Sequence, residues 1–305
     1  MTPKTTLIGF TVAALIGLVA ATGPAQELPT FQRVRQTGAI VVGHRDIAIP
    51  FSYYDGQHRP VGYSIDICMR IVEAIKVELG LKRVDVTFKE VSAATRIPLV
   101  ANGTVDMECG ATTNNATRQL QVSFATATFV SSTRFASKKS ARLGSLEDLR
   151  GKRLVAVAGT DNVLQLSEIS SKRQLGIIIV PAKDHTAAFH MLETDQVAAY
   201  AADDILAYGM IARSKAPADY VISTEPLSVE PYGIMLRKGD PDLKRVADGV
   251  IVKLFKSGEI HQLYGKWFLS MIPHFNVNLN VPMSDALKRV IARPTDSPNP
   301  NAYRD

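Results

Sequence analysis

The sequence has only two cysteines, Cys68 and Cys109, and one tryptophan among its 305 residues. Two cysteines are too few for a disulfide-dense scaffold, but an even number permits one disulfide bond in an exported protein. Two buried free thiols are the alternative, since Cys68 falls on an apolar helical face and Cys109 at the end of an apolar strand. The residues alone leave both alternatives open.

Long hydrophobic runs are absent after the first residues, where one such run extends from Leu7 to Ala21. Lys4 precedes it, and the small residues Gly23 and Ala25 follow it, which is the pattern of a secretory signal peptide. A membrane anchor or a helix of the mature fold is the alternative, but the run is short for a membrane span of about 20 residues. We expect residues 1–25 to be a cleaved signal peptide.

Clusters of basic residues are also absent. The formal net charge is +6, and removal of Lys4 with the signal peptide leaves +5. The Lys and Arg residues are scattered and form no block with interleaved aromatic residues. The sequence therefore predicts no nucleic-acid partner.

The familiar catalytic and cofactor motifs are missing. We find no G-x-S-x-G, no H-E-x-x-H, no phosphate-binding Gly-Lys-Ser/Thr loop and no strand-linked G-x-G-x-x-G. The six histidines show no metal-ligand spacing, and His185 and His190 would point to different helix faces. We expect no metal or cofactor, and a binding protein rather than an enzyme.

Strand and helix patterns alternate after residue 38, which predicts an α/β fold with mainly parallel sheets packed between helices. The expected strands are 39–43, 84–90, 105–109, 153–157, 176–180, 197–201 and 232–237. The expected helices are 67–79, 96–101, 146–149, 184–193, 203–212, a long stretch 241–268 and a tail helix 284–291. The pattern fits two domains in series, or two lobes joined by crossing strands with a C-terminal return to the first lobe.

Polar residues gather where predicted strands end and helices begin, which is where α/β sheets bind ligands. The junctions are 43–45, 92–96, 110–115 with Arg118, 159–161, 184–185 and 203–204. From these junctions we select three arginines, one histidine and one or two acids as candidate ligand contacts. A zwitterion with a second carboxylate needs such a set, because each of its charges requires a partner once it leaves water.

Several long segments carry a family resemblance. They are VVGHRDIAIPFSYYD, VGYSIDI, RIPLVANGTVDMECGATTNNATRQ, AKDH, the pair of aspartates at 203–204, and PYGIMLRKGDP. From about Val34 to the tail, the chain resembles the type II periplasmic amino-acid-binding proteins of ABC importers, and most closely their glutamate/aspartate-binding branch. The resemblance implies a two-lobed α/β fold with two hinge strands and a ligand cleft, with lobe 1 at 26–131 and 231–305 and lobe 2 at 132–230.

The resemblance also implies a site, a location and a partner. Arg118, Thr113 and Thr160 match contacts to the ligand's α-carboxylate, and Asp203 matches the acid that takes its ammonium group. Thr112 is a further expected ligand contact. The basic groups that match the surroundings of the side-chain carboxylate are Arg45, Arg96 and His185. We therefore expect a periplasmic monomer that binds an acidic amino acid and delivers it to a membrane permease.

The sequence departs from this branch at Ala93, Ala111 and Asp161, where two serines and a threonine are expected. Loss of two hydroxyls and gain of an acid weaken the expectation of tight glutamate binding.

Two other functions remain open. One is an enzyme similar to cyclohexadienyl dehydratases, with Asp161 or His185 as general acid. The other is a ligand-sensing module that would need a separate signalling partner.

Overall fold

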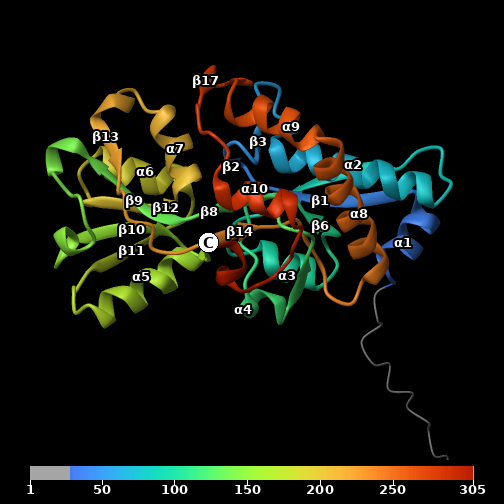
Figure 1. The fold of residues 1–305 in the computed structure, drawn as a ribbon, viewed down its shortest axis with the longest axis horizontal. Helices are drawn as coiled ribbons and strands as arrows, with labels where there is room; N and C mark the ends of the chain where they lie inside the picture. Colours follow the sequence, from blue (N-terminus) through green and yellow to red (C-terminus); the bar gives the residue numbers. More distant parts are fainter. Residues whose placement is uncertain (1–27, 305) are drawn as a thin grey trace, which may run out of the picture.

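The computed structural model describes residues 28–304, so the predicted signal peptide lies outside the described residues. Two five-stranded sheets organise the rest of the chain (Figure 1). We call the part built on each sheet the first and the second lobe. The predicted two-lobed α/β fold class is confirmed.

The first lobe contains the sheet with strand order β5-β1-β6-β15-β7. Strands β1, β5 and β6 are parallel, whereas β15 runs antiparallel to β6 and β7. The strands are β1 Ala39–His44, β5 Asp85–Glu90, β6 Met107–Glu108, β7 Val122–Phe124 and β15 Met235–Arg237. The helices are α1 Thr30–Thr37, α2 Tyr63–Glu78, α3 Arg96–Ala101, α4 Ala116–Gln119, α8 Pro241–Ser257 and α9 Glu259–Phe268. Short strands add β2 Ile47–Ala48, β3 Ser52–Tyr54, β4 Pro60–Val61, β16 Met271–Ile272 and β17 Val277–Asn278.

The second lobe contains the sheet with strand order β11-β10-β12-β9-β13. Strands β10, β11 and β12 are parallel, and β9 pairs antiparallel with both β12 and β13. The strands are β9 Thr133–Lys138, β10 Arg153–Val157, β11 Ile178–Ala182, β12 Ala199–Asp203 and β13 Tyr220–Ile222. The helices are α5 Asp161–Lys172, α6 His185–Glu193 and α7 Asp204–Ala212, with 3-10 turns η1 Lys139–Ala141, η2 Glu147–Leu149 and η3 Pro217–Asp219.

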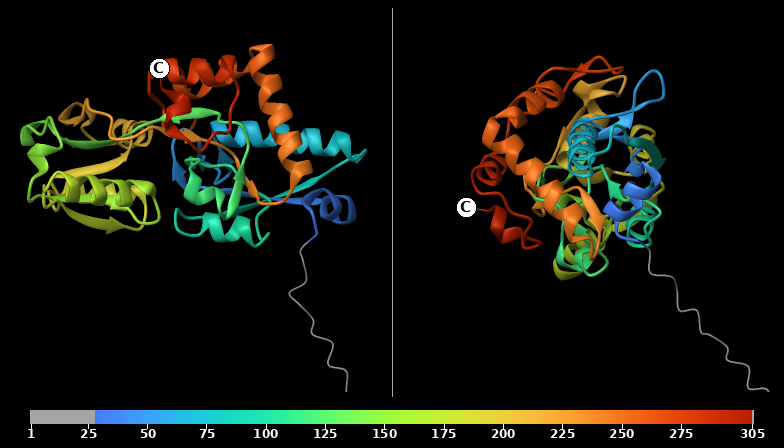
Figure 2. Two further views of the ribbon diagram at one scale, coloured as in Figure 1. Left: turned by 60° about the horizontal axis from the view of Figure 1, so that its bottom comes forward. Right: turned by 90° about the vertical axis from the view of Figure 1, so that its right-hand side faces the viewer.

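Two strands carry the chain between the lobes. Strand β8 Phe129–Ser131 leads into the second lobe, and β14 Glu230–Tyr232 leads back to the first. The two pair antiparallel as a ribbon of their own, which forms the narrow middle of the molecule in Figure 2. The C-terminal tail, with α10 Asp285–Ala292 and η4 Pro300–Tyr303, lies against this ribbon.

A cluster of buried aromatic rings packs beside the crossing strands. The ring of Phe51 meets those of Phe129, Tyr232 and Phe268 edge to face, at centroid distances of 4.9, 5.2 and 5.6 Å. Such arrangements add to the hydrophobic stabilisation that the buried ring area already provides. The cluster therefore anchors one end of the crossing ribbon in the core of the first lobe.

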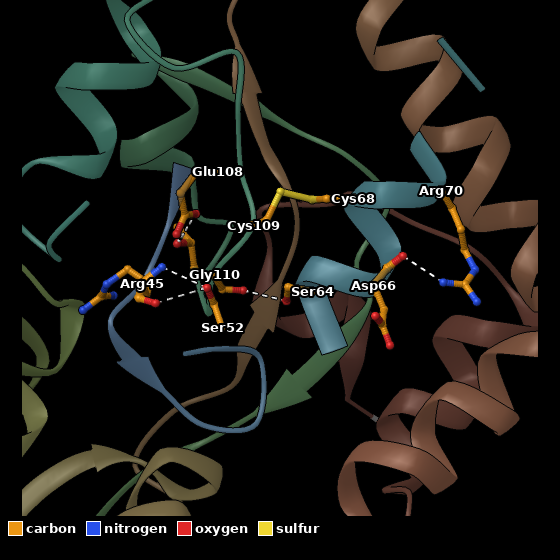
Figure 3. The surroundings of a disulfide bond; sticks show 10 residues. Arg45, Ser52, Ser64, Asp66, Cys68, Arg70, Glu108, Cys109 and Gly110 are labelled. Carbon is orange, nitrogen blue, oxygen red and sulfur yellow. Dashed lines mark hydrogen bonds between the residues drawn. A yellow bond between two sulfur atoms is a disulfide. The ribbon is translucent and has the colours of Figure 1, made fainter. Parts of the chain in front are cut away.

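Cys68 and Cys109 form a disulfide bond, which answers the question that the sequence left open. Both residues are fully buried, and the bond joins α2 to the residue just after β6 (Figure 3). The polar segment 110–115 begins at the next residue. The disulfide thus fixes the start of that segment to the main helix of the first lobe.

The predicted elements differ from the observed ones at local backbone features. The expected helix 241–268 is two helices, because Gly258 has a left-handed φ of 77° between α8 and α9. The expected strand 232–237 is divided between β14 and β15 at Gly233, where a Cβ atom would lie 2.9 Å from the Ala125 carbonyl oxygen. Across residues 28–304, no helix has both the length and the apolar character needed to cross a membrane.

Candidate functional site

A cavity lies between the lobes, where the carboxyl ends of β1 and β6 face those of β10 and β12. About 310 Å³ of space between its side chains is free of atoms, and about 10 Å³ of it can hold the centre of a water molecule. Its walls are therefore close together. The lining residues are Arg45, Arg96, Ala111, Thr113, Arg118, Thr160, Asp161, Asn162, His185, Asp203, Leu206 and Glu230.

Three arginines of the first lobe converge on the cavity. Arg45 follows β1, Arg96 begins α3 and Arg118 lies in α4, and each is 5% exposed or less. The Nε atoms of Arg45 and Arg96 are buried and have no hydrogen-bond partner among the residues described. Burial, followed by the nearby charges of Arg118 and Arg45, lowers the pKa of Arg96 to about 9. Arg96 therefore has too little negative charge nearby to offset its burial and the charges of its two neighbours.

Thr112 lies behind Arg96 and is not among the residues that line the cavity, so its predicted ligand contact stays a prediction. Its hydroxyl accepts a hydrogen bond from Arg96 Nη1 at 2.7 Å and donates one to Glu108 Oε2 at 2.7 Å. The neighbouring Thr113 does line the cavity, because successive side chains of an extended segment point to opposite sides. Thr112 is part of the support for Arg96.

Gly110 allows Glu108 and Arg45 to approach each other beside the disulfide (Figure 3). A Cβ atom at Gly110 would lie 2.1 Å from Glu108 Oε1 and 2.9 Å from Arg45 Cγ. Glu108 is fully buried, and its charge opposes the lowering of the Arg96 pKa. Glu108 is therefore an internal counter-charge for Arg96, and the sequence reasoning did not assign it that role.

The second lobe presents Asp203 at the end of β12. Its carboxylate accepts hydrogen bonds from Asn162 Nδ2, at 2.9 Å, and from the Tyr232 hydroxyl. Burial and the nearby charge of Glu230 raise the pKa of Asp203 to about 7, although both hydrogen bonds act in the opposite direction. A cation placed beside Asp203 would offset both of the effects that raise this pKa.

His185 lines the cavity beside Arg45 and Arg96. Burial, with the charges of Arg45 and Arg96, lowers the pKa of His185 to about 3, so the imidazole is neutral at pH 7. Its Nδ1 lies 2.6 Å from the Tyr200 hydroxyl. His185 can offer a hydrogen bond, but it has no extra proton to give as the general acid of the alternative enzyme.

Thr160 lies at the N-cap of α5 and lines the cavity, as predicted. Its hydroxyl donates to the Val157 carbonyl oxygen at 2.7 Å, so that proton already has an acceptor. Thr113 is held against the crossing strand by a bridge to Tyr232, and its carbonyl oxygen accepts from Arg118 Nη1 at 2.8 Å.

Arg118 and Asp161 form an ion pair across the two lobes. Arg118 Nη1 lies 2.8 Å from Asp161 Oδ2, and the side chains are 6% and 18% exposed. Asn115 Nδ2 donates to the same oxygen at 2.8 Å. The lobes also touch at Gly159, where a Cβ atom would lie 2.8 Å from Ala94 Cα. The sequence marked Asp161 as a departure from the family pattern but did not indicate its partner.

The cavity includes three residues that the sequence reasoning did not select. They are Asn162, Leu206 and Glu230. Leu206 lies one turn after Asp203, so helix geometry could have indicated it. Asn162 lies two residues after Thr160, a spacing that does not place two side chains on one helix face. Among residues 28–304, no group of three or more His, Cys, Asp or Glu side chains is arranged to hold a metal ion.

Comparison with known proteins gives consistent matches over most of the chain. An L-glutamate/L-aspartate-binding protein of Pseudomonas aeruginosa is 45% identical over 93% of this chain and 95% of its own. A glutamate/aspartate import solute-binding protein of Escherichia coli K12 is 37% identical over 96% and 97%. An ancestral arginine-binding protein, solved with arginine bound, superposes with a TM-score of 0.67 at 27% identity, over 76% of this chain and 98% of its own. The family model for residues 40–270 places the chain among the bacterial extracellular solute-binding proteins, family 3, and the chain belongs to that family.

Proposed function

We propose that this protein captures an acidic amino acid, glutamate or aspartate, between its lobes and delivers it to the membrane permease of an ABC importer. One observation carries the proposal: three buried arginines converge on one cavity that also holds Asp203. The names of the relatives support the same ligand class, and one of those names includes import.

Arg45 and Arg96 would bind the side-chain carboxylate of the ligand. Their unpartnered Nε atoms supply donors, and a bound carboxylate would supply the negative charge that this cluster lacks. If the Tyr200 hydroxyl donates to Nδ1 of His185, the imidazole proton lies on Nε2 and can serve the same carboxylate. Neutral side chains would leave these cations uncompensated, which favours Glu and Asp over neutral amino acids.

Arg118 and Thr113 would bind the α-carboxylate, and Asp203 the α-ammonium group. Asp203 is held in place by Asn162 and Tyr232, so an arriving ammonium group meets a fixed carboxylate. The ligand would then contact arginines of the first lobe and an acid of the second. A ligand that bridges the lobes stabilises their closed arrangement through its differential affinity for that arrangement.

The boundaries and the location complete this proposal. Lobe 1 would comprise residues 26–131 and 231–305 and lobe 2 residues 132–230, with hinges at β8 and β14, which pair with each other. Residues 1–25 would be removed on export, and the mature chain would act in the periplasm as a monomer. The buried disulfide is consistent with an oxidising compartment.

A thermal-shift panel on ligand-stripped protein tests the proposal. Glutamate and aspartate should raise the melting temperature, because a ligand that binds only the folded state stabilises it by mass action. At a hundredfold excess over Kd the stabilisation is about 2.7 kcal/mol. Glutamine, arginine and succinate, at equal concentrations, control for amide, cationic and dicarboxylate ligands. A larger shift with any of these than with glutamate and aspartate would contradict the ligand assignment.

A further inference from the structure

We propose that Asp161 competes with the ligand's α-carboxylate for Arg118, and thereby reduces the selection for ligands that carry an α-carboxylate. This inference rests on the proposed function, in which Arg118 binds that carboxylate. It concerns a residue of this chain that departs from the pattern of the branch that the sequence resembles.

The geometry places a carboxylate of the protein at the guanidinium group itself. Asp161 Oδ2 lies 2.8 Å from Arg118 Nη1, and Asn115 Nδ2 donates to the same oxygen at 2.8 Å. Asn115 is itself fixed, because its Oδ1 accepts from the Arg118 backbone N–H at 2.9 Å. The first lobe thus places a guanidinium group and one amide donor beside the same oxygen of Asp161, as it would beside a carboxylate of a ligand.

The backbone that carries Asp161 has little freedom to move away while the lobes are in contact. Asp161 is the first residue of α5, and Gly159, two residues earlier, lies against Ala93 and Ala94 of the first lobe. An α-carboxylate that binds Arg118 must therefore share the guanidinium group with Asp161 or displace it. Sharing brings two like charges together in a cavity that is largely shielded from water, which weakens binding.

A ligand without an α-carboxylate avoids this competition. A straight-chain ω-amino acid such as γ-aminobutyrate has one carboxylate for Arg45 and Arg96 and one ammonium group for Asp203. It leaves the pair between Arg118 and Asp161 intact. The structure therefore assigns to Asp161 the role of a specificity determinant, which disfavours α-amino acids relative to ω-amino acids.

Isothermal titration calorimetry of glutamate and γ-aminobutyrate against wild-type protein and Asp161→Asn tests this role. Removal of the charge should tighten glutamate binding by about tenfold, and should leave the γ-aminobutyrate affinity within about twofold. Unchanged or weaker glutamate binding by the variant would overturn the inference, as would an equal gain for both ligands.

Glu168→Gln provides the matched control. Glu168 lies on the same helix and pairs with Lys172 at the exposed surface. Its substitution by Gln removes one negative charge, as Asp161→Asn does. It should change neither affinity. Asp161→Thr serves as a second variant, since an Asn side chain could still donate to a ligand carboxylate. Failure of every protein to bind glutamate would contradict the proposed function and this inference together, whereas normal wild-type binding without tightening would contradict this inference alone.

Discussion

The two walls of the cavity carry opposite charges. The first lobe supplies Arg45, Arg96 and Arg118, and the second lobe supplies Asp161 and Asp203. In each wall, burial and like charges disfavour the charged form of a side chain. They lower the pKa of Arg96 in the first wall and raise the pKa of Asp203 in the second. A zwitterion with an extra carboxylate compensates both walls at once, so the segregation of charge links ligand binding to contact between the lobes.

Among the changes to the two charged walls, removal of Arg118 should cause the largest loss of glutamate affinity. Arg118→Ala deletes the proposed partner of the α-carboxylate and leaves Asp161 unpaired next to it. We expect a loss of about 4 kcal/mol, roughly a thousandfold in Kd for glutamate, measured by calorimetry. Arg83→Ala, at an exposed arginine of the same lobe, is the control and should bind normally. Near-wild-type affinity of Arg118→Ala would show that Arg118 does not bind the ligand's α-carboxylate.

Substitution of Arg45 should weaken the binding of the ligand's side-chain carboxylate without affecting the binding of its α-carboxylate. Arg45→Ala should weaken glutamate by about 2 kcal/mol, roughly thirtyfold, and change glutamine by no more than about threefold. The physical reason is that Arg45 brings a buried charge to the cavity, which only an anionic side chain needs. Competition titrations with both ligands measure the two losses. Equal losses would show that the first wall does not select for charge.

The smallest expected effect is the change of glutamate affinity with pH, which arises from Asp203 in the second wall. Since the pKa of Asp203 is raised to about 7, its carboxyl group takes up a proton below that pH and ceases to be a counter-ion for ammonium. Glutamate affinity should therefore fall about tenfold from pH 8 to pH 6, while the ligand's own side-chain carboxylate, with a pKa of about 4.3, stays ionised.

Asp203→Asn is the control for the pH dependence. The variant should bind more weakly and show a flat profile between pH 6 and pH 8. His185 does not titrate in this range, because its pKa is lowered to about 3. A sloping profile that persists in Asp203→Asn would assign the titration to a different group.

The order of strands and helices and most of the cavity residues could be predicted from the sequence. The cavity residues were predictable because polar groups follow the predicted strands, and because the resemblance covers the segments that contain these groups. Arg45, Arg96, Thr113, Arg118, Thr160, His185 and Asp203 all line the cavity. Their proximity follows from parallel strands that end at the same edge of a sheet.

The remaining features depend on distances between segments that the sequence does not encode locally. Asp161 was recognised as the gain of an acid, but its ion pair with Arg118 depends on the close approach of the two lobes. The charge state of His185 depends on burial beside two arginines, which residue type alone does not reveal. Thr112 was assigned to the ligand from the resemblance, which does not reveal its hydrogen bonds to Arg96 and Glu108.

Strand β15 occupies an inner position of the first sheet, between β6 and β7, although it comes more than a hundred residues after them. During synthesis the first lobe therefore stays incomplete until residue 237 and the helices that follow have emerged, whereas the second lobe is one continuous segment. Domains fold as units once their chain is available. The N-terminal segment, with the arginines of the cavity, therefore has an incomplete sheet until the C-terminal segment is available.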